Sequence, residues 1–150
     1  MKTLIIALFN LVIFTGSASA NNELAVYKSV VNDFCTNFSD ADKVNWKYED
    51  AFIKASFTTF EGENLEVFYS KDGNLIGKAK KVNLLAIPHK AIKTMAKKYP
   101  SSEYNITSTV AFTKANNQAY QYVSLENEKE TVILEVNKAG KIKVFQVNPK

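Results

Sequence analysis

Residues 63–75 read ENLEVFYSKDGNL, and residues 130–142, which lie 67 positions further on, read ETVILEVNKAGKI. In both stretches apolar residues alternate with polar ones, which is typical of a half-buried β-strand, and a glycine-bearing turn and a second apolar run follow. The offset places Gly73 on Gly140, so the turns coincide as well as the strands. Such a repeat predicts two copies of one structural unit.

The chain around these hairpins predicts a helix followed by four strands, twice over. In residues 23–38 apolar side chains recur at spacings of three and four, which indicates a helix with one buried stripe, and period-two runs follow. Pro88 begins a second helix that Tyr99-Pro100 ends, and four further strands are expected over about 103–113, 118–126, 129–137 and 141–148. The expected fold class is α+β: a tandem repeat of helix plus four antiparallel strands forming one sheet of about eight strands, with two helices on one face.

The first twenty residues are typical of a signal peptide. Lys2 precedes an apolar run, and Ala18-Ser19-Ala20 is a small-residue cleavage pattern. The apolar run is shorter than the about 20 residues that a membrane-spanning helix needs. We therefore expect cleavage after Ala20, one domain over residues 21–150, export to the periplasm or the extracellular space, and no membrane span.

The composition disfavours several classes of function. All basic residues are lysines, whereas specific recognition of phosphates and bases usually relies on arginine, so no nucleic-acid partner is expected. Cys35 is the single cysteine, and its apolar neighbours predict that it is buried. His89 is the single histidine, and no cluster has metal-ligand spacing, so no catalytic residue, metal or cofactor is expected.

Isolated aromatic residues stand on the more polar faces of several predicted strands. If those faces point away from the helices, they form a binding surface of aromatic residues among lysines, with Phe52, Lys54, Phe68, Lys143 and Phe145 as its members. Buried aromatic anchors dominate the energetics of protein interfaces. Single exposed apolar residues are nevertheless common on ordinary surfaces, and that alternative stays open.

Other aromatic residues are expected in the core. The 67-residue offset maps Tyr120 and Tyr122 onto Ile53 and Ala55, which predicts that both tyrosines are core residues. Trp46 is expected under the first helix, packed against Phe34 or Phe38 and almost completely buried.

Several motifs resemble a known family. Val44-Asn45-Trp46 follows the first helix, residues 67–75 form a strand and turn, and a Pro-started helix ends in Tyr99-Pro100. With these motifs, residues 23–148 resemble the PepSY-like family of β-lactamase-inhibitor-like proteins exported by Bacteroidetes, although Ile87-Pro88 stands where Leu-Pro is more usual. The resemblance implies two tandem helix-plus-four-strand units and, from the inhibitor that gives the family its name, a concave sheet face that holds an enzyme. It implies no catalytic residues.

Two hypotheses from different classes follow. The first is a non-enzymatic exported binding protein that engages a protein or peptide partner through the open face of its sheet. The second is a small-molecule carrier or enzyme with a pocket between helices and sheet, lined by Phe34, Trp46, Met95 and Tyr99. A cavity of several hundred Å³ in that layer would favour the carrier.

Overall fold

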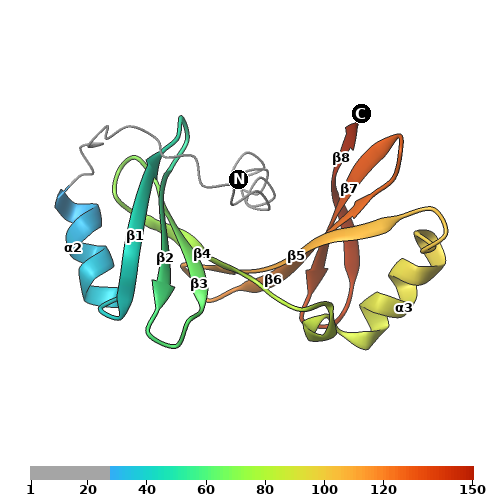
Figure 1. Ribbon diagram of the computed structural model, residues 1–150, viewed down its shortest axis with the longest axis horizontal. Helices are drawn as coiled ribbons and strands as arrows, with labels where there is room; N and C mark the ends of the chain where they lie inside the picture. Colours follow the sequence, from blue (N-terminus) through green and yellow to red (C-terminus); the bar gives the residue numbers. More distant parts are fainter. Residues whose placement is uncertain (1–27) are drawn as a thin grey trace. The chain divides into compact units, whose positions relative to one another are not determined.

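The computed structural model describes residues 28–150, so the expected signal peptide and the first residues of the first helix lie outside the described residues. The described part contains two α-helices and eight strands, which follow one another in chain order in one antiparallel sheet (Figure 1). The predicted α+β fold class is confirmed. The chain divides into two compact units between Lys80 and Lys81. None of the described helices is long and apolar enough to cross a membrane.

The first unit contains one helix and the first four strands. Antiparallel pairing of Ala55 with Val67, and of Ile53 with Tyr69, puts alternate residues of neighbouring strands on a common face. That face carries the apolar residues and lies against the helix. The elements are α2 (Lys28–Asn37), β1 (Ala41–Tyr48), β2 (Ile53–Thr59), β3 (Asn64–Tyr69) and β4 (Leu75–Lys81).

Aromatic packing forms the centre of the first core. Phe34 of α2 is buried, and its ring centroid lies 5.1 Å from those of both Trp46 and Phe57. The expected contact between Trp46 and Phe34 is confirmed. The expectation that Trp46 is almost completely buried is wrong, because it is half-buried. The reason is its place on β1, the first strand in the order, which has a neighbouring strand on one side only.

The second unit repeats this plan after a short 3₁₀ turn. Ala91 and Met95 are the buried residues of its helix, and they pack on Val123, Leu134 and other apolar side chains of the sheet. Pro88 stands at the N-cap of the helix, where its missing N–H is harmless. The elements are η2 (Leu84–Ala86), α3 (His89–Lys98), β5 (Asn105–Lys114), β6 (Ala119–Glu126), β7 (Glu130–Asn137) and β8 (Ile142–Pro149).

The repeated glycine lies at equivalent places in the two units. Gly73 and Gly140 both have positive φ, +85° and +73°, which favours glycine. Both also touch the start of their unit's helix: a Cβ on Gly73 would lie 2.9 Å from Ser29 Oγ, and one on Gly140 would lie 3.2 Å from Pro88 Cβ. The repeat therefore conserves a close approach of hairpin to helix as well as a turn.

Candidate binding surface

Three of the five predicted surface residues lie in the first unit, on the sheet face opposite α2. Lys54 pairs with Phe68 across β2 and β3, and the rings of Phe52 and Phe68 meet edge to face with centroids 5.6 Å apart. The structure thus brings these three residues together. However, the expectation that the two aromatic rings are exposed is wrong, because Phe52 is 3% exposed and Phe68 is 0% exposed.

A glycine lies across from Phe68 on the neighbouring strand. Phe68 pairs with Gly77 of β4. Gly77 itself is buried. Phe52 and Phe68 therefore act as packed core residues of this face and not as a ready docking surface.

The same face contains a buried ion pair. Glu66 is 4% exposed, and its Oε1 lies 3.1 Å from Lys54 Nζ and accepts a hydrogen bond of 3.1 Å from Ser56 Oγ. Among the described residues its Oε2 has no hydrogen-bond partner. Burial raises the pKa of Glu66 above its ordinary value of 4.5, and Lys54 and Ser56 oppose that rise. This face of the first unit thus combines buried aromatic rings with a buried carboxylate, and Lys54 and Ser56 beside them are partly exposed.

The other two predicted residues lie in the second unit, on the strand face opposite α3. Lys143 is exposed and pairs with Glu135 of β7. Phe145 is half-buried, and its ring meets the ring of Tyr122 edge to face with centroids 5.5 Å apart. Tyr122 Oη donates a hydrogen bond of 2.9 Å to Glu135 Oε2. Burial, with a contribution from Glu135, raises the pKa of Tyr122, which therefore keeps its proton. Sequence reasoning found Lys143 and Phe145 but missed Tyr122 and Glu135.

Tyr122 was missed because the repeat changes by one residue in β6. Ala55 pairs with Val67, whereas Val123 pairs with Leu134, so β2 corresponds to β6 at an offset of 68 instead of 67. A one-residue slip moves every side chain of a strand to the other face. Tyr122 is buried, as predicted, but it lies opposite the helix, and Tyr120 is only half-buried. Aligning the apolar pair Val123 and Leu125, instead of the tyrosines, with β2 would have revealed the slip.

The two residues with the most reactive side chains are both exposed. Cys35 is exposed, so the prediction that it is buried is wrong. It follows the buried Phe34, and a step of one residue along a helix turns the side chain away from the buried stripe. His89 is exposed at the start of α3. Within residues 28–150, no three His, Cys, Asp or Glu side chains come together to hold a metal ion.

The pocket expected between helix and sheet exists only in part. In the first unit the helix–sheet layer at Phe34 and Trp46 is filled by their mutual contact. In the second unit Met95 and Tyr99 line an apolar groove of about 230 Å³. This volume is below the roughly 300–1,000 Å³ typical of pockets for drug-sized ligands.

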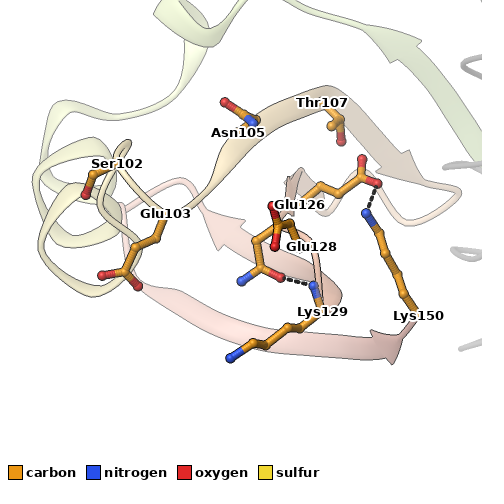
Figure 2. A pocket seen from close by; sticks show the side chains of 9 residues that line it. Ser102, Glu103, Asn105, Thr107, Glu126, Glu128, Lys129 and Lys150 are labelled. Atoms are coloured by element: carbon orange, nitrogen blue, oxygen red, sulfur yellow. Dashed lines mark hydrogen bonds and ion pairs between the residues drawn. The ribbon is translucent and has the colours of Figure 1, made fainter.

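A polar bay of about 800 Å³ lies at one end of the second unit (Figure 2). Lys150 and Glu126 form an ion pair of 2.6 Å across one side of it, and the backbone N–H of Lys129 donates to Asn127 Oδ1. Glu103 projects from the loop after α3 on the other side (Figure 2). The bay is open and lined by polar side chains, so it suits polar contacts with a partner but offers no apolar seat.

These observations define an α+β protein made of two helix-plus-four-strand units, with a half-exposed aromatic residue on the second. No family model matches the chain, and no curated protein matches its sequence. Solved structures do match its fold. A BLIP-like protein from Bacteroides fragilis is 13% identical with a TM-score of 0.67, and the match covers 85% of this chain and 89% of that one.

Two further structures give similar values. A "putative periplasmic" protein from Bacteroides eggerthii is 14% identical with a TM-score of 0.69, covering 83% of this chain and 88% of that one. A DUF2874 family protein from Bacteroides uniformis is 12% identical with a TM-score of 0.68, covering 83% and 89%. At these identities the similarity is one of fold.

Proposed function

We propose that the protein is an exported, non-enzymatic binding protein whose sheet engages a protein or peptide partner through its open face. The observation that carries this proposal is the half-exposed ring of Phe145, which lies on Tyr122 beside the exposed Lys143. Phe52 and Phe68 are left out of the contact surface because both are buried. The partner surface is therefore centred on β7 and β8.

The support beneath Phe145 suits an interface anchor. Tyr122 is fixed by its hydrogen bond to Glu135, so the ring on which Phe145 rests is held in one position. An anchor that is already ordered loses little conformational entropy when a partner binds. Lys143 and Glu135 add one charge of each sign next to the ring, which favours a defined orientation of the partner.

The comparisons support the class of this proposal. The fold is shared with a BLIP-like protein and with a protein described as periplasmic, both from Bacteroides. We extend the proposal to membership of the PepSY-like, β-lactamase-inhibitor-like family and to removal of a signal peptide after Ala20. A small-molecule carrier is the second candidate, because Met95 and Tyr99 line an apolar groove.

Site-specific photo-crosslinking tests the proposed surface. A photoreactive phenylalanine analogue at position 145 should trap an envelope protein of the producing organism, and Lys143→Glu should reduce the yield of that adduct. The matched control places the analogue at Val144, which is 48% exposed on the same strand. Val144 pairs with Leu134 of the α3 core and so lies on the other face. Equal adducts from both positions, or an adduct from position 144 alone, would disprove the surface.

A further inference from the structure

The apolar groove of the second unit has walls from helix, turn and strand. Ile92 and Met95 of α3, its C-cap residue Tyr99, Leu84 of η2 and Ile106 of β5 all line it. Ile106 is 45% exposed, and Leu84, Ile92 and Tyr99 are half-buried, so the groove offers apolar surface that the unit itself leaves partly uncovered.

One end of the groove is held rigid. The rings of Tyr99 and Tyr104 meet edge to face with centroids 5.2 Å apart, and Tyr104 Oη donates a hydrogen bond of 2.6 Å to Glu130 Oε1. Tyr99 also closes α3, since its N–H donates to Met95 O. The carboxylate of Glu130 thus already accepts a hydrogen bond from Tyr104. These contacts fix the tyrosine rings, so this end of the groove is formed before any partner binds.

The helix beside the groove is strongly basic. α3 carries four lysines and no acidic residue, and within the described part of the chain none of these lysines forms an ion pair. Lys93 and Lys97 each stand one residue after Ile92 and Ala96 of the groove wall, so they lie on the exposed side of α3 next to that wall, where the spacing of four makes them a row. A partner segment that extends from the groove across α3 would therefore meet a row of positive charge without an ion-pair partner.

We infer that this groove seats one large apolar side chain from an acidic segment of a partner protein. A volume of about 230 Å³ exceeds that of a cavity of roughly 150 Å³ that binds benzene, and so it accommodates a single tryptophan, phenylalanine or leucine side chain. The lysine row selects acidic residues on either side of that anchor. The inference is independent of the Phe145 surface, which lies on the other side of the sheet of this unit.

A short peptide provides the test. We would titrate the isotope-labelled protein with acetyl-Asp-Glu-Asp-Trp-Glu-Asp-Glu-amide and follow the methyl signals of Met95, Ile92 and Ile106 by NMR. Saturable shifts confined to these methyl groups are expected. Replacing the peptide's tryptophan by alanine, or changing both Lys93 and Lys97 to Glu, should weaken binding by about tenfold, which corresponds to about 1.4 kcal/mol.

Control variants separate the groove from general charge attraction. Lys78→Glu/Lys129→Glu makes the same change of net charge at two exposed positions outside the groove, and it should leave the affinity within about twofold, because screening weakens distant charges. Ile106→Asn alters the groove at an already exposed residue and should weaken binding without unfolding the protein.

Three results would overturn the inference. Methyl shifts that are absent would show that the groove does not accept the side chain. Equal binding of the tryptophan and alanine peptides would show attraction to the lysines alone. Indole-3-acetate that binds as tightly as the peptide would identify a site for small organic anions instead of a protein segment.

Discussion

Removing the positive partner of the buried ion pair should make the stability of the protein depend strongly on pH. Lys54 is 16% exposed and Glu66 6% exposed by side chain, and Glu66 Oε2 has no hydrogen-bond partner among the described residues. In Lys54→Met the methionine fills a similar volume, while the carboxylate loses both its neighbouring charge and a hydrogen bond. Burial raises the pKa of Glu66, and in the variant only the hydrogen bond from Ser56 still lowers it.

The sign follows from proton binding. The pKa of Glu66 in the folded state is above the ordinary value of 4.5. At a pH between the unfolded-state pKa and the folded-state pKa, the folded protein therefore binds more protons than the unfolded chain. The free energy of unfolding therefore falls as pH rises through that interval and is constant above it. The substitution widens the interval, and each further unit of pKa costs about 1.4 kcal/mol. At a pH where Glu66 is ionised in the variant, the unfolding free energy of Lys54→Met should be lower than that of wild type by about 3–5 kcal/mol.

Urea denaturation at pH 4.5 and pH 8 measures this effect. The difference in unfolding free energy between wild type and Lys54→Met should be small at pH 4.5 and several-fold larger at pH 8. Lys54→Met/Glu66→Gln should remove the pH dependence. Lys47→Met serves as the control, because its ion pair with Glu49 is largely exposed and contributes about 0–1 kcal/mol. A Lys54→Met deficit that is the same at both pH values would refute the buried-charge argument.

Three further substitutions test packing and hydrogen bonding. Gly140→Ala should lower the melting temperature more than Gly62→Ala. Both positions have positive φ, so alanine costs about 1–2 kcal/mol of backbone strain at each, but of the two only Gly140 has neighbouring atoms within 4 Å of the added Cβ. Equal losses would mean that the contact with α3 is unimportant. Trp46→Ala should cost about 2 kcal/mol by thermal melting, below the 3–5 of a fully buried tryptophan, because this side chain is half-buried; an unchanged melt would contradict its packing on α2. Tyr122→Phe removes the hydrogen bond to Glu135 and should cost about 1.5–3 kcal/mol in urea, and a neutral outcome would show that the bond is not formed in solution.

The fold could be predicted because its signals are local and occur twice. Alternation around Val67 and Leu134, together with the glycine turns, specified the strands and their antiparallel hairpins. The helix stripe of Phe34 and Met95 specified what covers the sheet. These patterns depend only on neighbours within one element or one hairpin.

The site could be predicted only in part because burial depends on residues remote in sequence. In the sequence, Phe52 and Lys54 look like an exposed strand face with one isolated aromatic residue, and nothing nearby indicates that Phe52 is buried. Nothing there indicates either that a glycine of another strand pairs with Phe68. Tyr122 shows a second limit, since one residue lost from a connection reverses the faces of a strand. Phe145 was found because Lys141 and Lys143 mark the polar face of β8, a strand that pairs only with β7 at the end of the sheet.

The sequential strand order has a consequence for the speed of folding. Nearly every strand pairs with the strand that precedes it across a short turn, and only the connection from β4 to β5 spans a helix. Closing short loops costs little entropy, so the relative contact order is low for a sheet of this size and we expect rapid folding. With a single cysteine, no disulfide within the chain has to form first. A chain that leaves a translocation channel unfolded would thus expose its apolar strands to proteases for only a short time.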